Sequence, residues 1–304
     1  MMRKFWGGWL LLLIFAQPLF AQLVFVPEKL NKSKANVLIV LHGCMQSAET
    51  MAAGTGFDTL ARKHNFVVIY PQVPEGSNMV DCWNWFYASN QKRESGQLEE
   101  IMTSVESKIQ DLDLKDPKLF VAGLSAGGIM ASSLLACFPE KFQAGAIHSG
   151  TSYGLAQNIL SGDYVLRRGP PAMLPWRFCN PKDFKGSLLA IHGDADEKVH
   201  PIHAEFLIED FTGLADPLKR TGSKKEGTAM STFEYTSKKD FRIARVHLVH
   251  GMGHAWFGSR PAGHCEDQLK SKGFSDVRLP FFESKGPHSS ELMMHFFLES
   301  LKRH

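Results

Sequence analysis

Runs of apolar residues recur along the chain and alternate with stretches of mixed polarity. Six of these runs predict buried strands, at 37–41, 66–70, 119–122, 144–148, 188–192 and 246–249. Because nearly every position in them is apolar, they are typical of parallel strands covered on both faces. Between the second and third runs, apolar side chains recur at helical spacing from Leu98 to Leu112. The pattern therefore predicts an α/β fold with a doubly wound, mostly parallel sheet.

The later part of the chain shows a different pattern. Apolar positions at 233–235 and 241–243 flank a turn rich in lysine, which predicts an antiparallel hairpin at the end of the sheet. The irregular segments at 150–186 and 255–288 are expected to form loops over a site. No internal repeat or low-complexity linker interrupts the pattern, so residues 22–304 are expected to form one domain.

One glycine-rich stretch comes directly after the third predicted strand. It reads Gly123-Leu124-Ser125-Ala126-Gly127-Gly128, and a small, apolar helix pattern follows from Ile129 to Ala136. In a G-x-S-x-G turn between a strand and a helix, the glycines permit a sharp turn that exposes the serine hydroxyl. The helix N-terminus then directs its N–H groups toward any anion formed beside Ser125. This arrangement indicates a nucleophile elbow.

Acidic and histidine residues follow other strands in the order that such a site needs. Asp194 and Asp196 follow the fifth predicted strand, His254 follows the sixth, and His42-Gly43-Cys44 follows the first. Sites in open α/β sheets lie outside the carboxyl ends of the strands, so these groups are expected near Ser125. A serine, then an acid, then a histidine is the chain order typical of nucleophilic hydrolysis on such a sheet.

Taken together, these motifs resemble those of the secreted polyhydroxybutyrate-depolymerase-type esterases, an α/β-hydrolase group that also contains feruloyl and acetylxylan esterases. The matching stretches are His42-Gly43-Cys44-Met45-Gln46, Cys82-Trp83-Asn84-Trp85-Phe86, Gly123-Leu124-Ser125-Ala126-Gly127-Gly128, His192-Gly193 with Asp196 and Val199, Gly253-His254-Ala255-Trp256, and the closing Gly286-Pro287. The resemblance implies the α/β-hydrolase fold, with a nucleophile elbow in a doubly wound, mostly parallel sheet.

The resemblance also implies a role for each part of the site. Ser125 is the expected nucleophile, Asp196 the acid and His254 the base. The backbone amides of Cys44 and Ala126 are expected to form the oxyanion hole. Asp194 lies in the same loop as Asp196 and is the alternative acid, with a turn or a helix cap as its other explanation.

The activity that follows is that of a serine carboxylic-ester hydrolase working through an acyl-enzyme. The resemblance implies polyester or oligomers of 3-hydroxybutyrate as the substrate. The alternative substrates are feruloyl or acetyl groups on plant polysaccharides, and a peptidase is possible from the chemistry alone. A non-catalytic binding protein on this fold would lack a member of the triad, and all three are present. This reaction needs no metal or organic cofactor, so none is expected.

Three tryptophans flank the expected site, namely Trp83, Trp85 and Trp256. Buried aromatic side chains usually belong to the core. The functional alternative is a hydrophobic wall for the acyl or polyester chain, with Trp256 as the best candidate because it is two residues from His254.

One segment and one residue depart from the pattern of the resembled group. Residues 259–280 lengthen the segment between His254 and the closing motif, and Gln97 follows Gly96 where such enzymes often have glutamate. A structural role of that acid is therefore expected to be missing or moved.

The first residues indicate export. Arg3 and Lys4 precede the apolar run 10–15, and a cleavage site before Gln22 would remove residues 1–21 as a signal peptide. A membrane anchor is the alternative, but the apolar run is short for a bilayer span. The protein is therefore expected in the periplasm or outside the cell, with no membrane association after cleavage.

Export makes disulfides expected among the five cysteines. The resemblance suggests a bridge between Cys44 and Cys82, which would hold an oxyanion donor in place. Cys179 with Cys265 is a weaker pairing, and Cys137, which follows an apolar helix pattern, is expected to be a buried free thiol.

Charge adds little to this picture. The formal net charge is +3 and falls to +1 without Arg3 and Lys4, so no nucleic-acid partner is expected. His200 and His203 have a spacing that metal ligands use, but Pro201 lies between them and no carboxylate completes a zinc motif, so no metal is expected. The expected partner is an ester substrate, and the oligomeric state is left open.

Overall fold

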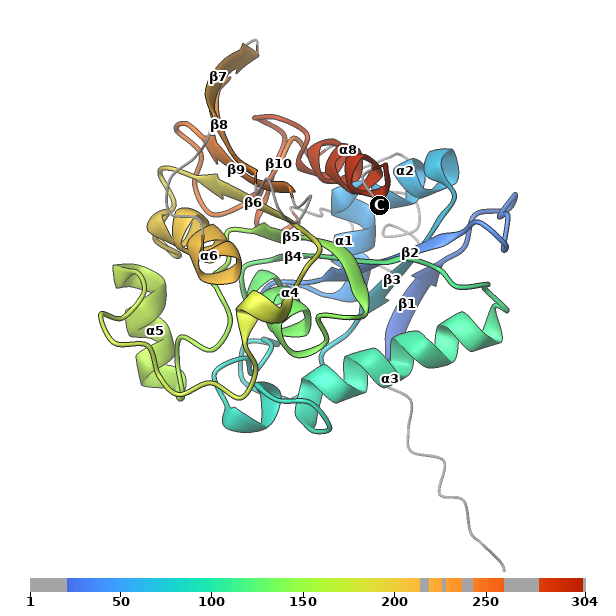
Figure 1. Ribbon diagram of the computed structural model, residues 1–304, viewed down its shortest axis with the longest axis horizontal. Coiled ribbons are helices and arrows are strands. Elements are labelled where there is room, and N and C mark those ends of the chain that lie inside the picture. Colours follow the sequence, from blue (N-terminus) through green and yellow to red (C-terminus); the bar gives the residue numbers. More distant parts are fainter. Residues whose placement is uncertain (1–20, 214–218, 226–227, 237–242, 260–278, 303–304) are drawn as a thin grey trace, which may run out of the picture.

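A nine-stranded sheet forms the centre of the described structure (Figure 1). The computed structural model describes residues 21–213, 219–225, 228–236, 243–259 and 279–302. The strand order is β1-β3-β2-β4-β5-β6-β9-β8-β7. Six central strands are parallel: β3 (Phe66–Pro71), β2 (Asn36–Leu41), β4 (Leu119–Leu124), β5 (Phe142–His148), β6 (Ser187–Gly193) and β9 (Ile243–Val249). The antiparallel strands are β1 (Gln22–Phe25) at one edge and β8 (Thr228–Thr236) with β7 (Lys219–Lys225) at the other.

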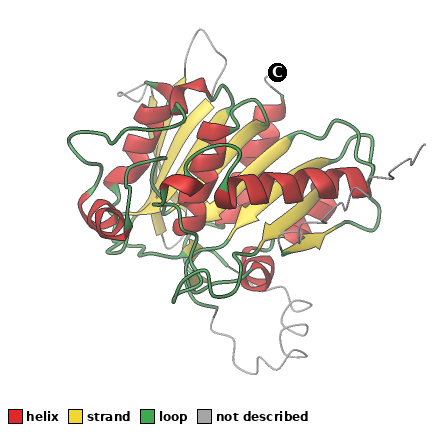
Figure 2. Cartoon of the chain, turned by 90° about the horizontal axis from the view of Figure 1, so that it is seen from below, coloured by secondary structure: helices red, strands yellow, loops and turns green. Residues whose placement is uncertain are grey.

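Helices cover both faces of this sheet, as Figure 2 shows. The hydrophobic cluster on one face includes α3 (Gly96–Asp111), α4 (Ala126–Cys137) and α6 (Ile202–Thr212). The cluster on the other face includes α1 (Ala48–Thr55), α2 (Phe57–His64) and α8 (Ser289–Leu301). The strands β10 (Trp256–Phe257) and β11 (Phe282–Glu283) form a separate parallel pair. The two short 3-10 helices are η1 (Ala88–Asn90) and η2 (Pro181–Asp183).

The alternation of side chains along β2 explains why both faces need a cover. Val37, Ile39 and Leu41 belong to the cluster with α4, whereas Leu38 and Val40 belong to the cluster with α8. All five side chains are 0% exposed. Burial of an aliphatic side chain of this size contributes about 1.5–3 kcal/mol, so a strand that is apolar on both faces is stable only between two helical layers.

The helices begin and end at residues that suit those positions. The Ser47 side chain caps α1 by accepting a hydrogen bond from the Thr50 N–H, and Thr50 Oγ1 accepts one from the Ser47 N–H at 2.8 Å. Gly56 then adopts a left-handed φ of 71°, which ends α1 and lets α2 begin in a new direction. Local sequence therefore sets the boundary between these two helices.

The structure confirms the predicted α/β-hydrolase sheet and each of its six predicted strands. The antiparallel end of the sheet is also present, with Tyr235 opposite Ala244 and Thr236 opposite Ile243. The turn at 237–242 and the leader at 1–20 lie outside the described residues, and so does Cys265. Within the ranges that are described, no helix is long and apolar enough to cross a bilayer.

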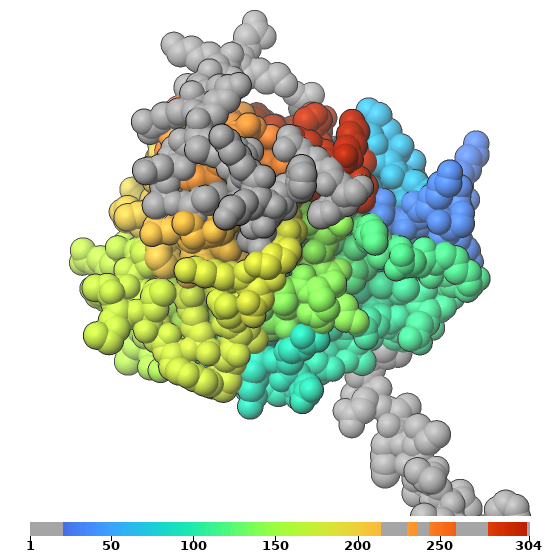
Figure 3. Space-filling view, viewed as in Figure 1, coloured from blue at the N-terminus to red at the C-terminus, as the bar shows by residue number. Residues whose placement is uncertain are grey.

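The segment at 150–186 is more ordered than a set of loops, because it contains α5 (Ile159–Arg168). Asn158 caps this helix by accepting from the Ser161 N–H at 2.9 Å. In Figure 3 the yellow-green chain that includes α5 forms a continuous part of the surface next to α6. The backbone also links α5 to the loop after β6, through the His200 N–H and the Leu166 carbonyl at 2.7 Å.

The structure corrects the expected pairing of the cysteines. Cys137 is not a free thiol, because it forms a disulfide with Cys179, and their Cα atoms are 5.1 Å apart. The Cys179 N–H donates to the Tyr153 hydroxyl at 3.2 Å, and that hydroxyl donates to the Gln91 carbonyl. These contacts bring the returning chain to the end of α4, an approach that the spacing of the cysteines does not reveal.

Candidate active site

Ser125 lies between β4 and α4 in a strained backbone conformation, with φ 57° and ψ −123°. Its N–H donates to the His148 carbonyl at 2.9 Å, which fixes the turn against β5. A Cβ on Gly127 would overlap the carbonyl oxygens of Leu41 and His42, and only glycine permits that approach. The serine is partly exposed. The described backbone therefore has the geometry of a nucleophile elbow, and its strain is of the kind found at functional sites.

The loop after β2, residues 42–46 and here called the β2 loop, is held by one of its own side chains and by the segment at Val80. Its Gly43 N–H donates to Gln46 Oε1 at 2.8 Å, and its Met45 N–H donates to the Val80 carbonyl at 2.9 Å. Among the described residues, neither Cys44 N–H nor Ala126 N–H donates a hydrogen bond to the protein. These two amides are thus available to a ligand, as the predicted oxyanion hole requires.

His42 orients the peptide bond that carries the Cys44 N–H. Its Nε2 accepts from the Val73 N–H at 3.2 Å, so the proton is on Nδ1, which donates to the Gly43 carbonyl at 2.8 Å. Burial lowers the pKa of His42 to about 4, so the ring is neutral near pH 7. Because a C=O and the next N–H point in opposite directions from one planar peptide, fixing the Gly43 carbonyl also fixes the Cys44 N–H.

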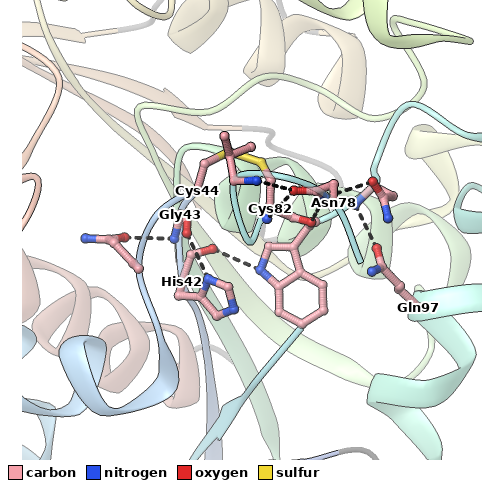
Figure 4. Close-up of a disulfide and its surroundings, with 10 residues drawn as sticks. His42, Gly43, Cys44, Asn78, Cys82 and Gln97 are labelled. Carbon is pink, nitrogen blue, oxygen red and sulfur yellow. Dashed lines mark hydrogen bonds between the residues drawn. A yellow bond between two sulfur atoms is a disulfide. The ribbon is translucent and has the colours of Figure 1, made fainter. Parts of the chain in front are cut away.

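Cys44 and Cys82 form a disulfide, the pairing that the resemblance suggests (Figure 4). The Cys82 N–H donates to Asn78 Oδ1 at 3.0 Å, and Asn78 Nδ2 donates to the Cys82 carbonyl at 2.6 Å. Gln97 Oε1 accepts from the Asn84 N–H at 2.8 Å. An amide oxygen thus supplies an acceptor to this loop, so a structural role at position 97 is present and not missing. The bridge joins the β2 loop to this braced segment.

The expected acid, Asp196, lies in the loop after β6, residues 194–199, which is here called the β6 loop. Asp196 Oδ1 accepts from the Lys198 and Val199 N–H groups, each at 2.9 Å. Asp196 Oδ2 accepts from His254 Nδ1 at 2.7 Å, and His192 Nε2 lies 3.3 Å from the same oxygen. Burial alone would raise the pKa of Asp196, but the hydrogen bonds from His192 and His254 outweigh it and lower the pKa well below its usual range. The carboxylate is therefore ionised.

Backbone hydrogen bonds bring this loop to the one after β9, residues 250–257, here called the β9 loop. The Asp194 N–H donates to the Val249 carbonyl at 3.1 Å, and the Ala195 N–H donates to the Met252 carbonyl at 3.0 Å. The side chain of Asp194 accepts from His250 Nδ1 and from the Gly251 N–H, both at 2.7 Å. Of the two candidate acids, Asp196 contacts His254 and Asp194 closes the turn beside it.

The three tryptophans do not form a wall open to substrate. Trp83 and Trp256 are 0% exposed and Trp85 is 3% exposed, so the described structure favours the core interpretation. Trp83 Nε1 donates to the His42 carbonyl at 2.9 Å, and Trp256 Nε1 donates to Ser290 Oγ at 3.0 Å. Trp83 thus ties its segment to the start of the β2 loop, and Trp256 ties the β9 loop to α8. A large aromatic side chain near a site in the sequence can therefore belong to the core and not to the substrate surface.

Sequence reasoning missed the contact of His192 with Asp196. His192 is 1% exposed, and its Nε2 also lies 2.9 Å from the Val199 carbonyl, an oxygen that only accepts. The ring therefore carries its proton on Nε2 and directs it between this carbonyl and the Asp196 carboxylate. Its place four residues before Asp196, at the start of the same loop, was the available indication.

No cluster of three or more metal-binding side chains occurs in the described part of the chain. His203, one of the two histidines with metal-like spacing, is 0% exposed and donates from Nε2 to the Val165 carbonyl at 2.8 Å. It therefore supports α5 from α6.

A family model described as "Esterase PHB depolymerase" matches residues 20–234. The chain belongs to this family. Poly(3-hydroxyalkanoate) depolymerase C of Paucimonas lemoignei is 26% identical over 229 residues, which cover 73% of this chain and 55% of that protein. An acetylxylan esterase of Coprinopsis cinerea is 32% identical over 133 residues, covering 43% of this chain and 35% of that protein. Feruloyl esterase B of Neurospora crassa is 33% identical over 130 residues, covering 42% of this chain and 43% of that protein. The chain thus spans about half or less of the length of these relatives.

Solved structures agree on the fold. Acetyl xylan esterase from Aspergillus awamori superposes with a TM-score of 0.63 at 18% identity, over 84% of this chain and 94% of that one. A Pyrococcus horikoshii acylaminoacyl peptidase gives a TM-score of 0.55 at 16% identity, over 93% of this chain and 40% of that one. At these identities the likeness shows the α/β-hydrolase fold alone.

Proposed function

We propose that this protein is a serine esterase that hydrolyses short-chain polyhydroxyalkanoate, such as 3-hydroxybutyrate polyester or its oligomers. One observation carries the proposal. The 2.7 Å bond between His254 and the buried Asp196 lies at the same edge of the sheet as the strained Ser125. Membership of the family and the depolymerase among the relatives support the substrate.

The contacts of His254 suit it to act as the base. Because Nδ1 donates to Asp196, the proton of the neutral ring is on Nδ1 and Nε2 is free to accept the Ser125 proton. Attack on an ester carbonyl then produces an oxyanion, which the N–H groups of Cys44 and Ala126 would stabilise. The ionised Asp196 stabilises the imidazolium that forms in this step.

The same residues complete the reaction. The His254 imidazolium gives its proton to the departing alcohol and leaves an acyl group on Ser125. A water molecule then attacks the acyl-enzyme with His254 again as base, and Ser125 is restored. Besides the ester and water, the proposed steps use only Ser125, Asp196, His254 and the two backbone amides.

A feruloyl or acetylxylan esterase is the second candidate. The relatives with these names are 32–33% identical to the chain, although over less than half of its length. The residues that carry out the chemistry would be the same, so only the substrate separates the two candidates.

Product release from three substrates tests the proposal. Purified protein without residues 1–21 and its Ser125→Ala variant are given 3-hydroxybutyrate oligomers, methyl ferulate and acetylated xylan. We expect preferential release of 3-hydroxybutyrate by the first protein and a loss of about 10⁴-fold or more in the variant. Release of ferulate or acetate alone would move the substrate to plant polysaccharide, and hydrolysis that survives in the variant would refute the serine mechanism.

We also propose that the protein is exported. The leader pattern at 1–21 supports this, and so do the two disulfides, which persist in oxidising compartments. Recovery of the protein outside the cytoplasm with Gln22 at its N-terminus is the expected result, and a retained leader would contradict it.

A further inference from the structure

The segment 279–283, here called the closing segment, joins the two halves of the candidate site. Its Pro280 carbonyl accepts from Gln46 Nε2 at 2.7 Å, and Gln46 is part of the β2 loop. Its Phe281 carbonyl accepts from the Trp256 N–H at 2.8 Å, and Trp256 is part of the β9 loop. Two consecutive carbonyls thus bind the loop with the expected oxyanion donor and the loop with the expected base. The closing segment therefore borders the site between them.

Phe281 has an uncommon backbone conformation for a residue with a large side chain. Its φ is 62°, in the left-handed region that asparagine and glycine favour. The hydrogen bonds on either side of it hold the backbone in place. This conformation sets the direction of the Phe281 ring. The next side chain, Phe282, points elsewhere and lies against Gly54 of α1. Strain held by surrounding contacts is typical of positions where one side chain must point into a site.

The Phe281 ring lies against the expected base. Its centroid is 5.8 Å from that of His254, with an interplanar angle of 79°, an edge-to-face arrangement. Unlike the buried tryptophans, Phe281 is partly exposed. Among the described residues it is the aromatic side chain that both contacts His254 and reaches solvent. It is thus placed to contact a bound ester.

The chemistry of His254 decides which part of the ester lies there. A general acid must be within hydrogen-bond reach of the leaving oxygen, so the alcohol part of the ester lies on the histidine side of the scissile carbonyl. The carbonyl oxygen itself lies toward Cys44 and Ala126. We propose that Phe281 is the specificity-determining contact for the alcohol part of the ester, which it receives on an apolar aromatic surface. This inference rests on the proposed function, because it requires His254 to protonate a leaving alcohol.

Two series of esters separate the alcohol side from the acyl side. The first keeps the acetyl group and changes the alcohol, from methyl acetate to butyl and benzyl acetate. The second keeps methanol and changes the acyl group, from methyl acetate to methyl butyrate and methyl hexanoate. The proteins are wild type, Phe281→Asn, which removes the ring and suits a left-handed φ, and Phe281→Tyr, which keeps the ring. Phe282→Leu is the matched control, because its side chain faces α1.

We expect Phe281→Asn to lower the ratio of kcat/KM for benzyl acetate to that for methyl acetate about tenfold, the size of one lost aromatic contact. The ratio of methyl hexanoate to methyl acetate should stay within about twofold, and Phe281→Tyr and Phe282→Leu should keep both ratios. If Phe281→Asn does not fold, as judged by circular dichroism, Phe281→Leu is tested in its place. We then expect a smaller loss in the same ratio of kcat/KM values.

A change confined to the acyl series would overturn the inference, and so would a uniform fall in kcat across all esters. Wild-type hydrolysis that depends on Ser125, together with an unchanged alcohol ratio in the variants, would overturn the inference alone. Absence of any Ser125-dependent hydrolysis would overturn both the inference and the proposed function.

Discussion

The two sides of the candidate site differ in the groups that form them, which are mainly backbone groups on one side and side chains on the other. On the nucleophile side, the proposed working groups are the strained Ser125 and two backbone amides, and glycines make room for the chain. On the acid–base side, the proposed working groups are side chains from two loops, and Asp196 and His254 meet across 58 residues of sequence. The first side depends on backbone geometry within short motifs. The second depends on which loops the sheet places together.

This contrast predicts which substitutions affect folding and which affect only the reaction. A replacement that alters the backbone near the elbow or the β2 loop disturbs the packing of β2 against α4. A replacement of a carboxylate by an amide of the same shape leaves the packing in place and changes only charge and hydrogen bonding. Three experiments test this contrast.

The largest effect is expected from the two aspartates of the β6 loop. Asp196→Asn should lower kcat by about 10⁴, because an amide neither stabilises the imidazolium nor fixes the proton on Nδ1. Asp194→Asn is the matched control and should keep turnover close to wild type, since Asp194 binds His250 and the Gly251 N–H. Steady-state kinetics on one soluble ester measures both. The reverse pattern would assign the acid to Asp194.

The two disulfides provide a second contrast. They close loops of similar length, with separations of 38 and 42 residues, so removal of either should cost about 4 kcal/mol of stability in the loop-entropy model. Cys44→Ser with Cys82→Ser should also lower kcat by up to about 10²-fold, because the Cys44 amide is one of the two proposed oxyanion donors. The pair Cys137→Ser with Cys179→Ser should lower stability without that loss.

Denaturant unfolding and kcat below the unfolding transition are measured on both double variants. Equal kcat values in the two would show that the Cys44–Cys82 bridge stabilises the fold but does not position the amide.

The smallest effect concerns acid stability on the nucleophile side. The pKa of His42 falls from 6.5 to about 4 on burial, so the unfolded chain takes up this proton more readily than the folded one. Stability that depends on neutral His42 is therefore complete above about pH 6.5 and decreases as the pH falls toward 4. His42→Asn keeps a donor near the Gly43 carbonyl and should reduce the pH slope of the unfolding free energy by about 1.4 kcal/mol per pH unit.

Urea unfolding at several pH values between 6.5 and 4 gives this slope. His200→Asn serves as the control, because His200 is exposed. A His42→Asn slope equal to that of wild type would show that this ring does not contribute to acid unfolding.

Much of the site could be predicted because its motifs are local. The turn at Ser125 needs glycines within two residues on either side, so G-x-S-x-G between an apolar strand and an apolar helix is visible in the sequence. The carboxyl ends of parallel strands share one edge, which placed the β6 and β9 loops near Ser125. By contrast, no sequence motif marks Phe281. Its φ and its contact with His254 depend on the hydrogen bonds that join the closing segment to Gln46 and Trp256.

Strand periodicity and turn glycines act over a few residues. The strands, the elbow after β4, the chain order of serine, acid and histidine, and the resemblance to the family could therefore be predicted from the printed sequence. Three outcomes required the folded structure: the contact of Asp196 with His254, the pairing of Cys137 with Cys179 and the burial of the three tryptophans. These outcomes depend on distances between segments 40 or more residues apart, or on whether another layer covers a side chain. Periodicity along the chain reports which residues are apolar, and packing decides which of them a substrate can reach.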